Sequence, residues 1–132
     1  MTDACCGRVL VVEDDDDLRG SLTHSLQCEG YDVEEARNGR EALDCLHKTD
    51  GHRPGCILLD LMMPVMNGWQ FREAQQQDPD PSIADIPVIV LSAVGGHVQK
   101  VQPLDAVAFM RKPFDLDVLL ETIQRHCHVE AA

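Results

Sequence analysis

The sequence predicts an α/β domain in which a parallel sheet is covered by helices on both faces. Three observations lead to this fold class. Short apolar runs recur along the chain, segments of helical periodicity separate them, and two of the runs end directly in acids. The run over 56–59 is apolar at every position, which is typical of a strand buried on both faces. Strands that alternate with helices form parallel sheets, because each crossover carries the chain back over the sheet.

The first half of the chain is expected to supply three strands and two helices. Asp15 or Asp16 can cap the first helix, and Gly30 can end it. The strand over 56–59 delivers Asp60 at its carboxyl end. In chain order, the expected elements are a strand over 8–12, a helix carrying Leu18, Leu22 and Leu26, a strand over 31–36, a helix carrying Ala42, Leu43 and Leu46, and the strand over 56–59.

The second half repeats the alternation less regularly. A turn at Asn67 and Gly68 precedes a short helix, and residues 78–81 have the composition of a loop without periodicity. Asp115 is positioned to cap a final helix. The expected elements are a helix over 69–77, a strand over 86–91 ending at Ser92, a strand over 106–110, and a helix carrying Leu116, Leu119, Leu120, Ile123 and Cys127.

Composition limits the possible functions. A length of 132 residues suits one domain over 1–132, with a leader over 1–7 and a tail over 126–132 expected to be poorly ordered. The formal net charge of -12 favours a cation or a basic partner and argues against direct contact with nucleic acid. We expect the six cysteines to be reduced thiols in a cytoplasm, with Cys28, Cys45 and Cys56 on core faces. No apolar run is long enough to cross a membrane.

Polar side chains follow the strands at the points where the strands end. Since the carboxyl ends of parallel strands meet at one edge of the sheet, this edge should gather Glu13, Asp14, Asp60, Ser92 and Lys112. Close carboxylates repel one another unless a cation joins them, and hard oxygen ligands suit Mg²⁺. A carboxylate can also attack phosphorus and form an aspartyl phosphate. The pattern therefore indicates Mg²⁺-assisted phosphoryl chemistry, with Lys112 and Ser92 neutralising the phosphoryl oxygens.

Four segments, in this order, carry a resemblance to a known family. They are Val11-Val12-Glu13-Asp14, the run from Leu58 through Asp60 to Pro64 with Asn67-Gly68, the run from Ile86 to Ala93, and Phe109-Met110-Arg111-Lys112-Pro113-Phe114. The chain resembles the receiver domains of two-component response regulators from Val9 to about Ile123. That resemblance implies a flavodoxin-like, doubly wound sheet of five parallel strands in the order 2-1-3-4-5.

The resemblance also implies roles for the residues at this edge. Asp60 would accept a phosphoryl group from a phosphohistidine of a sensor histidine kinase or a histidine phosphotransfer protein. Asp14 would bind Mg²⁺ directly, Glu13 through water, and Met62 through its backbone carbonyl, while Asp60 completes the metal site. Lys112 would contact the phosphoryl oxygens. Ser92 and Phe109 resemble the switch pair of the family.

The protein so implied is a cytoplasmic signalling switch rather than an enzyme for an outside metabolite. It would catalyse only its own phosphoryl transfer and autodephosphorylation. Its output would pass to a protein target through contact or phosphorelay, without nucleic acid or a membrane. The chain could equally be a receiver from a longer protein.

Three departures from the family pattern stand out. Glu13 occupies a position where aspartate is usual, and Met62 places an apolar side chain near the acceptor. Over 95–103, where the family has its fourth helix, Gly95, Gly96 and Pro103 oppose helix formation. We therefore expect that helix to be short or irregular.

Two alternative functions would use the same residues. A Mg²⁺-dependent aspartyl-phosphate phosphatase commonly has a second aspartate two residues after its nucleophile, whereas this chain has Met62 there. A flavodoxin-like cofactor binder needs a phosphate-binding loop after its first strand, where Glu13 and the acids that follow would repel phosphate. Both alternatives are therefore less favoured than the receiver.

Overall fold

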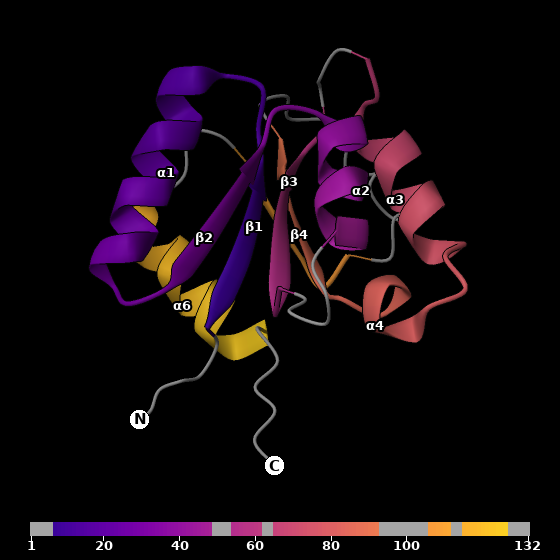
Figure 1. Ribbon diagram of the computed structural model, residues 1–132. Helices are drawn as coiled ribbons and strands as arrows, with labels where there is room; N and C mark the ends of the chain where they lie inside the picture. The colour runs from indigo at the N-terminus through magenta and orange to yellow at the C-terminus, as the bar shows by residue number, and fades with distance from the viewer. Residues whose placement is uncertain (1–6, 49–53, 62–64, 93–105, 112–114, 127–132) are drawn as a thin grey trace.

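Five strands form one parallel sheet in the order β2-β1-β3-β4-β5 (Figure 1). The computed structural model describes residues 7–48, 54–61, 65–92, 106–111 and 115–126. Every neighbouring pair of strands is parallel, which confirms the predicted flavodoxin-like order. The strands are β1 (Arg8–Val12), β2 (Asp32–Ala36), β3 (Cys56–Asp60), β4 (Val88–Ser92) and β5 (Ala108–Arg111).

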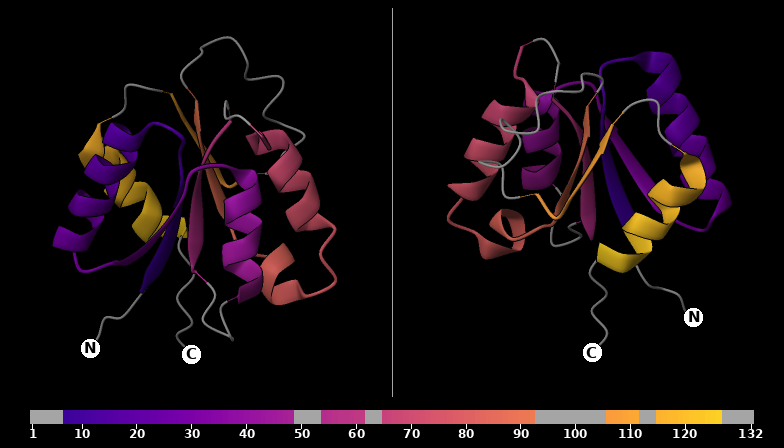
Figure 2. Two further views of the ribbon diagram at one scale, coloured as in Figure 1. Left: turned by 45° about the horizontal axis from the view of Figure 1, so that its top comes forward. Right: turned by 180° about the vertical axis from the view of Figure 1, so that it is seen from behind.

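Helices cover both faces of the sheet, as Figure 2 shows from two directions. One face carries α1 and α6, and the other carries α2, α3 and α4. This two-sided cover is what right-handed crossovers produce when the chain winds outward from a central strand. The helices are α1 (Asp16–Cys28), α2 (Gly39–Lys48), α3 (Gly68–Gln76), α4 (Pro81–Ala84) and α6 (Leu116–His126).

The core consists of two apolar layers separated by the sheet. Alternate strand residues enter each layer because successive side chains point to opposite faces. Leu10 and Leu59 pack under α2 and α3, whereas Val11 and Leu58 pack under α1 and α6. All five residues of β3 are buried, as the uniformly apolar run predicts. β3 is thus the central strand, and the acid at its end is fixed by packing on both sides.

Side-chain hydrogen bonds to backbone N–H groups cap the starts of several helices. Asp15 caps α1 by accepting hydrogen bonds from the N–H groups of Asp17 and Leu18 at 3.0 and 3.1 Å. Asn38 accepts from the N–H of Glu41 at 3.0 Å, and the Glu41 carboxylate accepts from the N–H of Arg37, so this is not a complete capping box. A complete capping box occurs at α3, where the Asn67 and Gln70 side chains each bond the other's backbone N–H.

The sequence did not predict α4, which begins at Pro81, the last residue of the loop expected over 78–81. Asp80 caps the short helix α4, and Pro81 fits its first turn because no hydrogen-bond donor is needed there. The buried amide of Gln75 donates to the carbonyl oxygens of Ile83 and Ile86 at 2.8 and 3.2 Å, which ties α3 to this segment. Four residues are too few for a periodic signal, so sequence periodicity could not reveal the helix.

Other expectations need correction or fall outside the described residues. Cys28 is exposed rather than on a core face, because two residues past Leu26 is about 200° around the helix. Cys56 is buried. The pKa of the partly buried Cys45 thiol is raised, chiefly because burial disfavours the charged thiolate. The final helix ends at His126, the first residue of the tail predicted over 126–132. The fourth-helix segment over 95–103, residues 1–6 of the leader and residues 127–132 of the tail lie outside the described ranges. Within those ranges no helix has the length and apolarity to span a membrane.

A histidine–aspartate contact joins the end of α2 to the loop before α4. The side chains of His47 and Asp78 approach to 2.6 Å. The Asp80 N–H, which donates to the Asp78 carboxylate, and the His47 ring together hold the pKa of Asp78 below its ordinary value. A carboxylate with a lowered pKa stabilises the fold above its unfolded pKa, and this contribution is lost as pH falls through the folded pKa.

We therefore expect Asp78→Asn to lower the free energy of unfolding at pH 7. The difference from the wild type should shrink once the pH falls below about 4, where the carboxyl is protonated in the unfolded chain. Urea unfolding at several pH values measures this. Asp85→Asn removes the same charge from an exposed side chain and serves as the control. A difference that persists unchanged at pH 2 would contradict the role of the carboxylate.

Candidate functional site

Strand register brings three acids together at the carboxyl edge of the sheet. Val12 pairs with Leu59, so the residues that follow them, Glu13 and Asp60, emerge side by side. Carboxylate oxygens of Glu13, Asp14 and Asp60 all lie within 4.8 Å of one another. This edge is the upper one in Figure 1, where β1 leads into α1. The structure therefore brings together all three acids that the sequence assigns to the site.

Glu13 is held at its side chain and at both ends of its backbone. It is 1% exposed, and its Oε2 accepts a hydrogen bond from the Asp15 N–H at 3.1 Å. Its own N–H donates to the Ala36 carbonyl at 3.0 Å. Its carbonyl accepts from Nη1 of Arg19 at 2.9 Å. The Glu13 carboxylate is thus buried and oriented, whereas the neighbouring Asp14 is exposed.

Asp60 is 3% exposed at the end of the central strand. The Gly68 N–H donates to the carbonyl of Leu61, the residue after Asp60, at 3.0 Å. A Cβ at Gly68 would lie 2.8 Å from both the Asp60 carbonyl oxygen and Leu61 Cα. Only glycine permits this approach. Gly68 is the first residue of α3, and its lack of a Cβ allows α3 to begin directly against the Asp60 backbone.

Val65 adopts a left-handed backbone conformation in the same loop. Its φ is 67°, and its side chain is 80% exposed. The left-handed region costs an L-residue about 1–2 kcal/mol, and β-branched residues are rarely found there. The next residue, Met66, accepts a hydrogen bond from the Gly39 N–H at 3.0 Å, so the loop is attached to the start of α2 as well as to α3.

Replacing Val65 by asparagine should stabilise the protein by about 1 kcal/mol, because asparagine tolerates this conformation better. The midpoint and slope of urea unfolding give the change in the free energy of unfolding. Val118→Asn, made at an exposed helical valine, gives the effect of the side chain without the left-handed backbone. A destabilised Val65→Asn would contradict the assignment of strain.

The other predicted site residues are only partly described. Ser92 pairs through its backbone with Arg111, which places the end of β4 beside the end of β5. Phe109 is partly buried and packs against the layer under α2 and α3. Lys112, Met62 with its carbonyl, and the side chain of Ser92 lie outside the described part of the structure. Their roles stay predictions.

The donor set fits a small divalent cation. Three carboxylates at this separation repel one another, and two of them are buried where water screens them poorly. Mg²⁺ prefers oxygen ligands and is bound through one or two carboxylates while it keeps several waters. The exposed Asp14 beside two buried acids offers both carboxylate oxygens and access to water.

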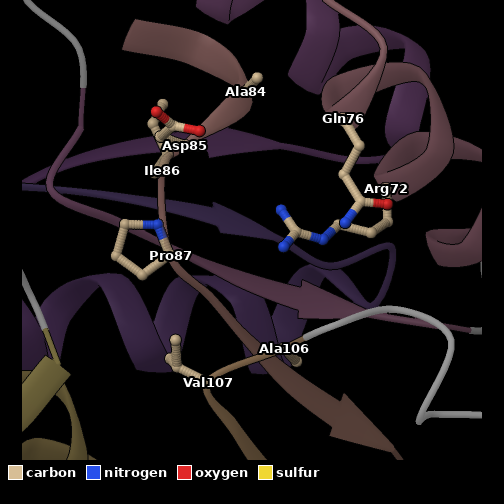
Figure 3. A pocket seen from close by; sticks show the side chains of 8 residues that line it. All are labelled: Arg72, Gln76, Ala84, Asp85, Ile86, Pro87, Ala106 and Val107. Atoms are coloured by element: carbon tan, nitrogen blue, oxygen red, sulfur yellow. The ribbon is translucent and has the colours of Figure 1, made fainter. Parts of the chain in front are cut away.

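A cavity of about 680 Å³ lies at the opposite edge of the sheet (Figure 3). Arg72 and Gln76 extend into it from α3, facing Asp85, Pro87 and Val107. The Arg72 guanidinium is mostly buried and donates to Oε1 of Gln75 at 2.7 Å. The cavity lies near the amino ends of β4 and β5 and contains none of the three clustered acids. It is therefore separate from the acidic site.

Fold and site together define a flavodoxin-like α/β protein with acids gathered at the carboxyl ends of its strands. The family model for the response regulator receiver domain matches residues 9–124. The chain belongs to this family. It is 41% identical over 115 residues to the response regulator MprA of Mycolicibacterium vanbaalenii, a match covering 86% of this chain and 47% of that protein. The chain thus spans about half the length of the curated relatives it matches.

Solved structures of similar fold include receivers of several bacteria. The chemotaxis response regulator CheY4 of Vibrio cholerae is 34% identical, with a TM-score of 0.80 and coverage of 91% of this chain and 98% of that one. The response regulator TrrA of Thermotoga maritima, solved in complex with Mg²⁺ and BeF, is 28% identical, with a TM-score of 0.77 and coverage of 90% and 97%. The predicted family and fold are therefore confirmed.

Proposed function

We propose that this protein is a phosphorylation-switched signalling module whose phosphoacceptor is Asp60. The observation that carries the proposal is the convergence of Glu13, Asp14 and Asp60 at the carboxyl edge, with Asp60 buried at the end of the central strand. Membership of the receiver family and the similarity to a receiver solved with Mg²⁺ and BeF support it.

In the proposed reaction, a carboxylate oxygen of Asp60 attacks the phosphorus of a phosphohistidine on a histidine kinase or a histidine phosphotransfer protein. A P–O bond forms, the P–N bond breaks, and the donor imidazole leaves with the electron pair. Asp14, and Glu13 through water, would hold Mg²⁺, with the Met62 carbonyl as a further ligand. Mg²⁺ supplies charge neutralisation for the phosphoryl oxygens and the carboxylates. Lys112 would neutralise a further phosphoryl oxygen, and hydrolysis of the acyl phosphate would reset the switch.

The signal would leave the domain as a change of shape. Ser92 would move toward the new phosphoryl oxygens, and the half-buried Phe109 ring would move into the vacated space, which is a shift between two populated states. The recipient would be a protein target or the next protein of a phosphorelay.

Acetyl phosphate as a small donor tests the proposal without knowledge of the partner. Incubation of the wild type with acetyl phosphate and Mg²⁺ should add one hydroxylamine-sensitive phosphoryl group by intact mass. The same incubation with EDTA should add none, since the close acids then lack a neutralising cation. Full phosphorylation in EDTA, or no phosphorylation with Mg²⁺, would show the proposal to be wrong.

A further inference from the structure

Arg19 joins three elements at the acidic edge of the sheet. From α1, its Nη1 donates to the Glu13 carbonyl at 2.9 Å, at the end of β1. Its Nη2 contacts Oδ1 of Asp16 at 2.5 Å, in the first turn of the same helix. Its Nε lies 3.9 Å from Oε1 of Glu35, near the end of β2. The side chain is only 13% exposed, so these contacts fix it in one place.

The contact with Glu13 is made to the backbone, and this determines what it can control. The Glu13 carbonyl belongs to the peptide unit that joins Glu13 to Asp14. A peptide unit is planar, so fixing its oxygen also fixes the direction in which the chain enters Asp14. The carboxylates on either side of this unit are two of the three that converge within 4.8 Å. Arg19 therefore holds the peptide unit that lies between two of the clustered acids.

The charge of Arg19 is largely compensated by its own partners. Asp16 and Glu35 both lie beside the guanidinium, and Glu35 is further held by the Thr23 hydroxyl, which donates to Oε2 at 2.6 Å. A lone cation next to a cation site would weaken metal binding by repulsion. A positioning group strengthens binding by reducing the reorganisation of the ligands. Removal of a repelling cation would raise the affinity for Mg²⁺, whereas removal of a positioning group would lower it. Measuring the affinity of an Arg19 variant therefore distinguishes the two effects.

We propose that Arg19 is a positioning residue for the metal site, acting through the Glu13 carbonyl to direct the carboxylates of Glu13 and Asp14. The proposal rests on the proposed Mg²⁺ site. The sequence shows the Asp16–Arg19 spacing of an ordinary helical ion pair, and the contact with the Glu13 backbone appears only in the fold.

Calorimetric titration of the full chain with Mg²⁺ tests this. Arg19→Met should weaken Mg²⁺ binding about tenfold, the size typical for loss of a group that orients metal ligands. Arg19→Lys should lose less, because one ammonium can still donate to the Glu13 carbonyl but cannot bridge it to both acids. Arg37→Met removes an equal charge from an exposed side chain just beyond β2, so its affinity should match the wild type.

A second readout needs no metal. The Asp15 N–H donates to the Glu13 carboxylate. In EDTA, hydrogen exchange of this amide with solvent should be faster in Arg19→Met than in the wild type, whereas exchange of the β3 amides should be unchanged. If Arg19→Met does not fold, the affinity of Arg19→Lys decides. Binding by the Arg19 variants as tight as in the wild type, or tighter, would overturn the positioning role while leaving the proposed function intact. A wild type that binds no Mg²⁺ would overturn both.

Discussion

Asp60→Asn is expected to abolish phosphoryl uptake from acetyl phosphate, because the amide is not a nucleophile toward phosphorus and no other described acid shares its position at the end of the central strand. Intact mass after incubation with Mg²⁺ measures the uptake. Asp85→Asn, which alters an exposed acid at the opposite edge beside the Arg72 cavity, is the matched control and should be phosphorylated like the wild type. A hydroxylamine-sensitive phosphoryl group on Asp60→Asn would refute the assignment.

The same variant should also lose stabilisation by the metal. A cation that binds only the folded state raises stability by about 2.7 kcal/mol at a concentration 100 times its Kd. Thermal unfolding of the wild type should therefore shift upward on addition of Mg²⁺. Asp60→Asn keeps two of the three clustered carboxylates, so its shift should be clearly smaller. An equal shift in both proteins would place the metal elsewhere.

Gly68→Ala is expected to destabilise the protein by about 2–3 kcal/mol, because overpacking forces backbone atoms apart. The new Cβ would lie 2.8 Å from the Asp60 carbonyl oxygen and from Leu61 Cα, and the backbone atoms of these two buried residues cannot move aside cheaply. Because the displaced group is the backbone of Asp60, phosphoryl uptake should fall together with stability. Urea unfolding and intact mass measure the two effects.

Gly20→Ala provides the control for this substitution. Gly20 is exposed within α1, and a Cβ there would meet nothing within 4 Å. Alanine should stabilise the helix by about 0.5–1 kcal/mol, since glycine is less favourable in a helix interior. If Gly68→Ala were as stable as Gly20→Ala, the close approach at Asp60 would be shown not to constrain the loop.

Regular elements could be predicted from sequence where a local pattern agrees with burial. Residues 8–12 form a strand with the expected bounds, and the strand expected over 56–59 also includes Asp60. Short apolar runs of this kind have one favourable environment in an α/β protein. The cap at Asp15 likewise follows from local hydrogen bonds. The convergence of Glu13 with Asp60 could be inferred only from the rule that parallel strands share an edge.

Features that depend on tertiary contacts were beyond sequence reasoning. The short helix α4 is held by the Gln75 amide, a contact between residues eight or more apart. The left-handed Val65 contradicts the preference of valine, since the attachments of the loop to α2 and α3 determine its backbone. Arg19 has the spacing of an ion-pair residue, and its partner on the Glu13 backbone depends on how α1 packs over β1 and β2.

The edge strand β2 has a consequence for how copies of this protein behave together. Among the described strands, β2 pairs with β1 alone, so its other side presents backbone groups to which a strand of another molecule could add. Three of its five residues are acids, Asp32, Glu34 and Glu35. Arg8 and Arg19 offset only part of their charge, since two cations face three acids. A second copy added through the same strand would therefore bring net negative charge against negative charge, which is destabilising. The acids of β2 thus oppose aggregation through the edge of the sheet, and they do so from side chains that are not among the clustered acids of the site.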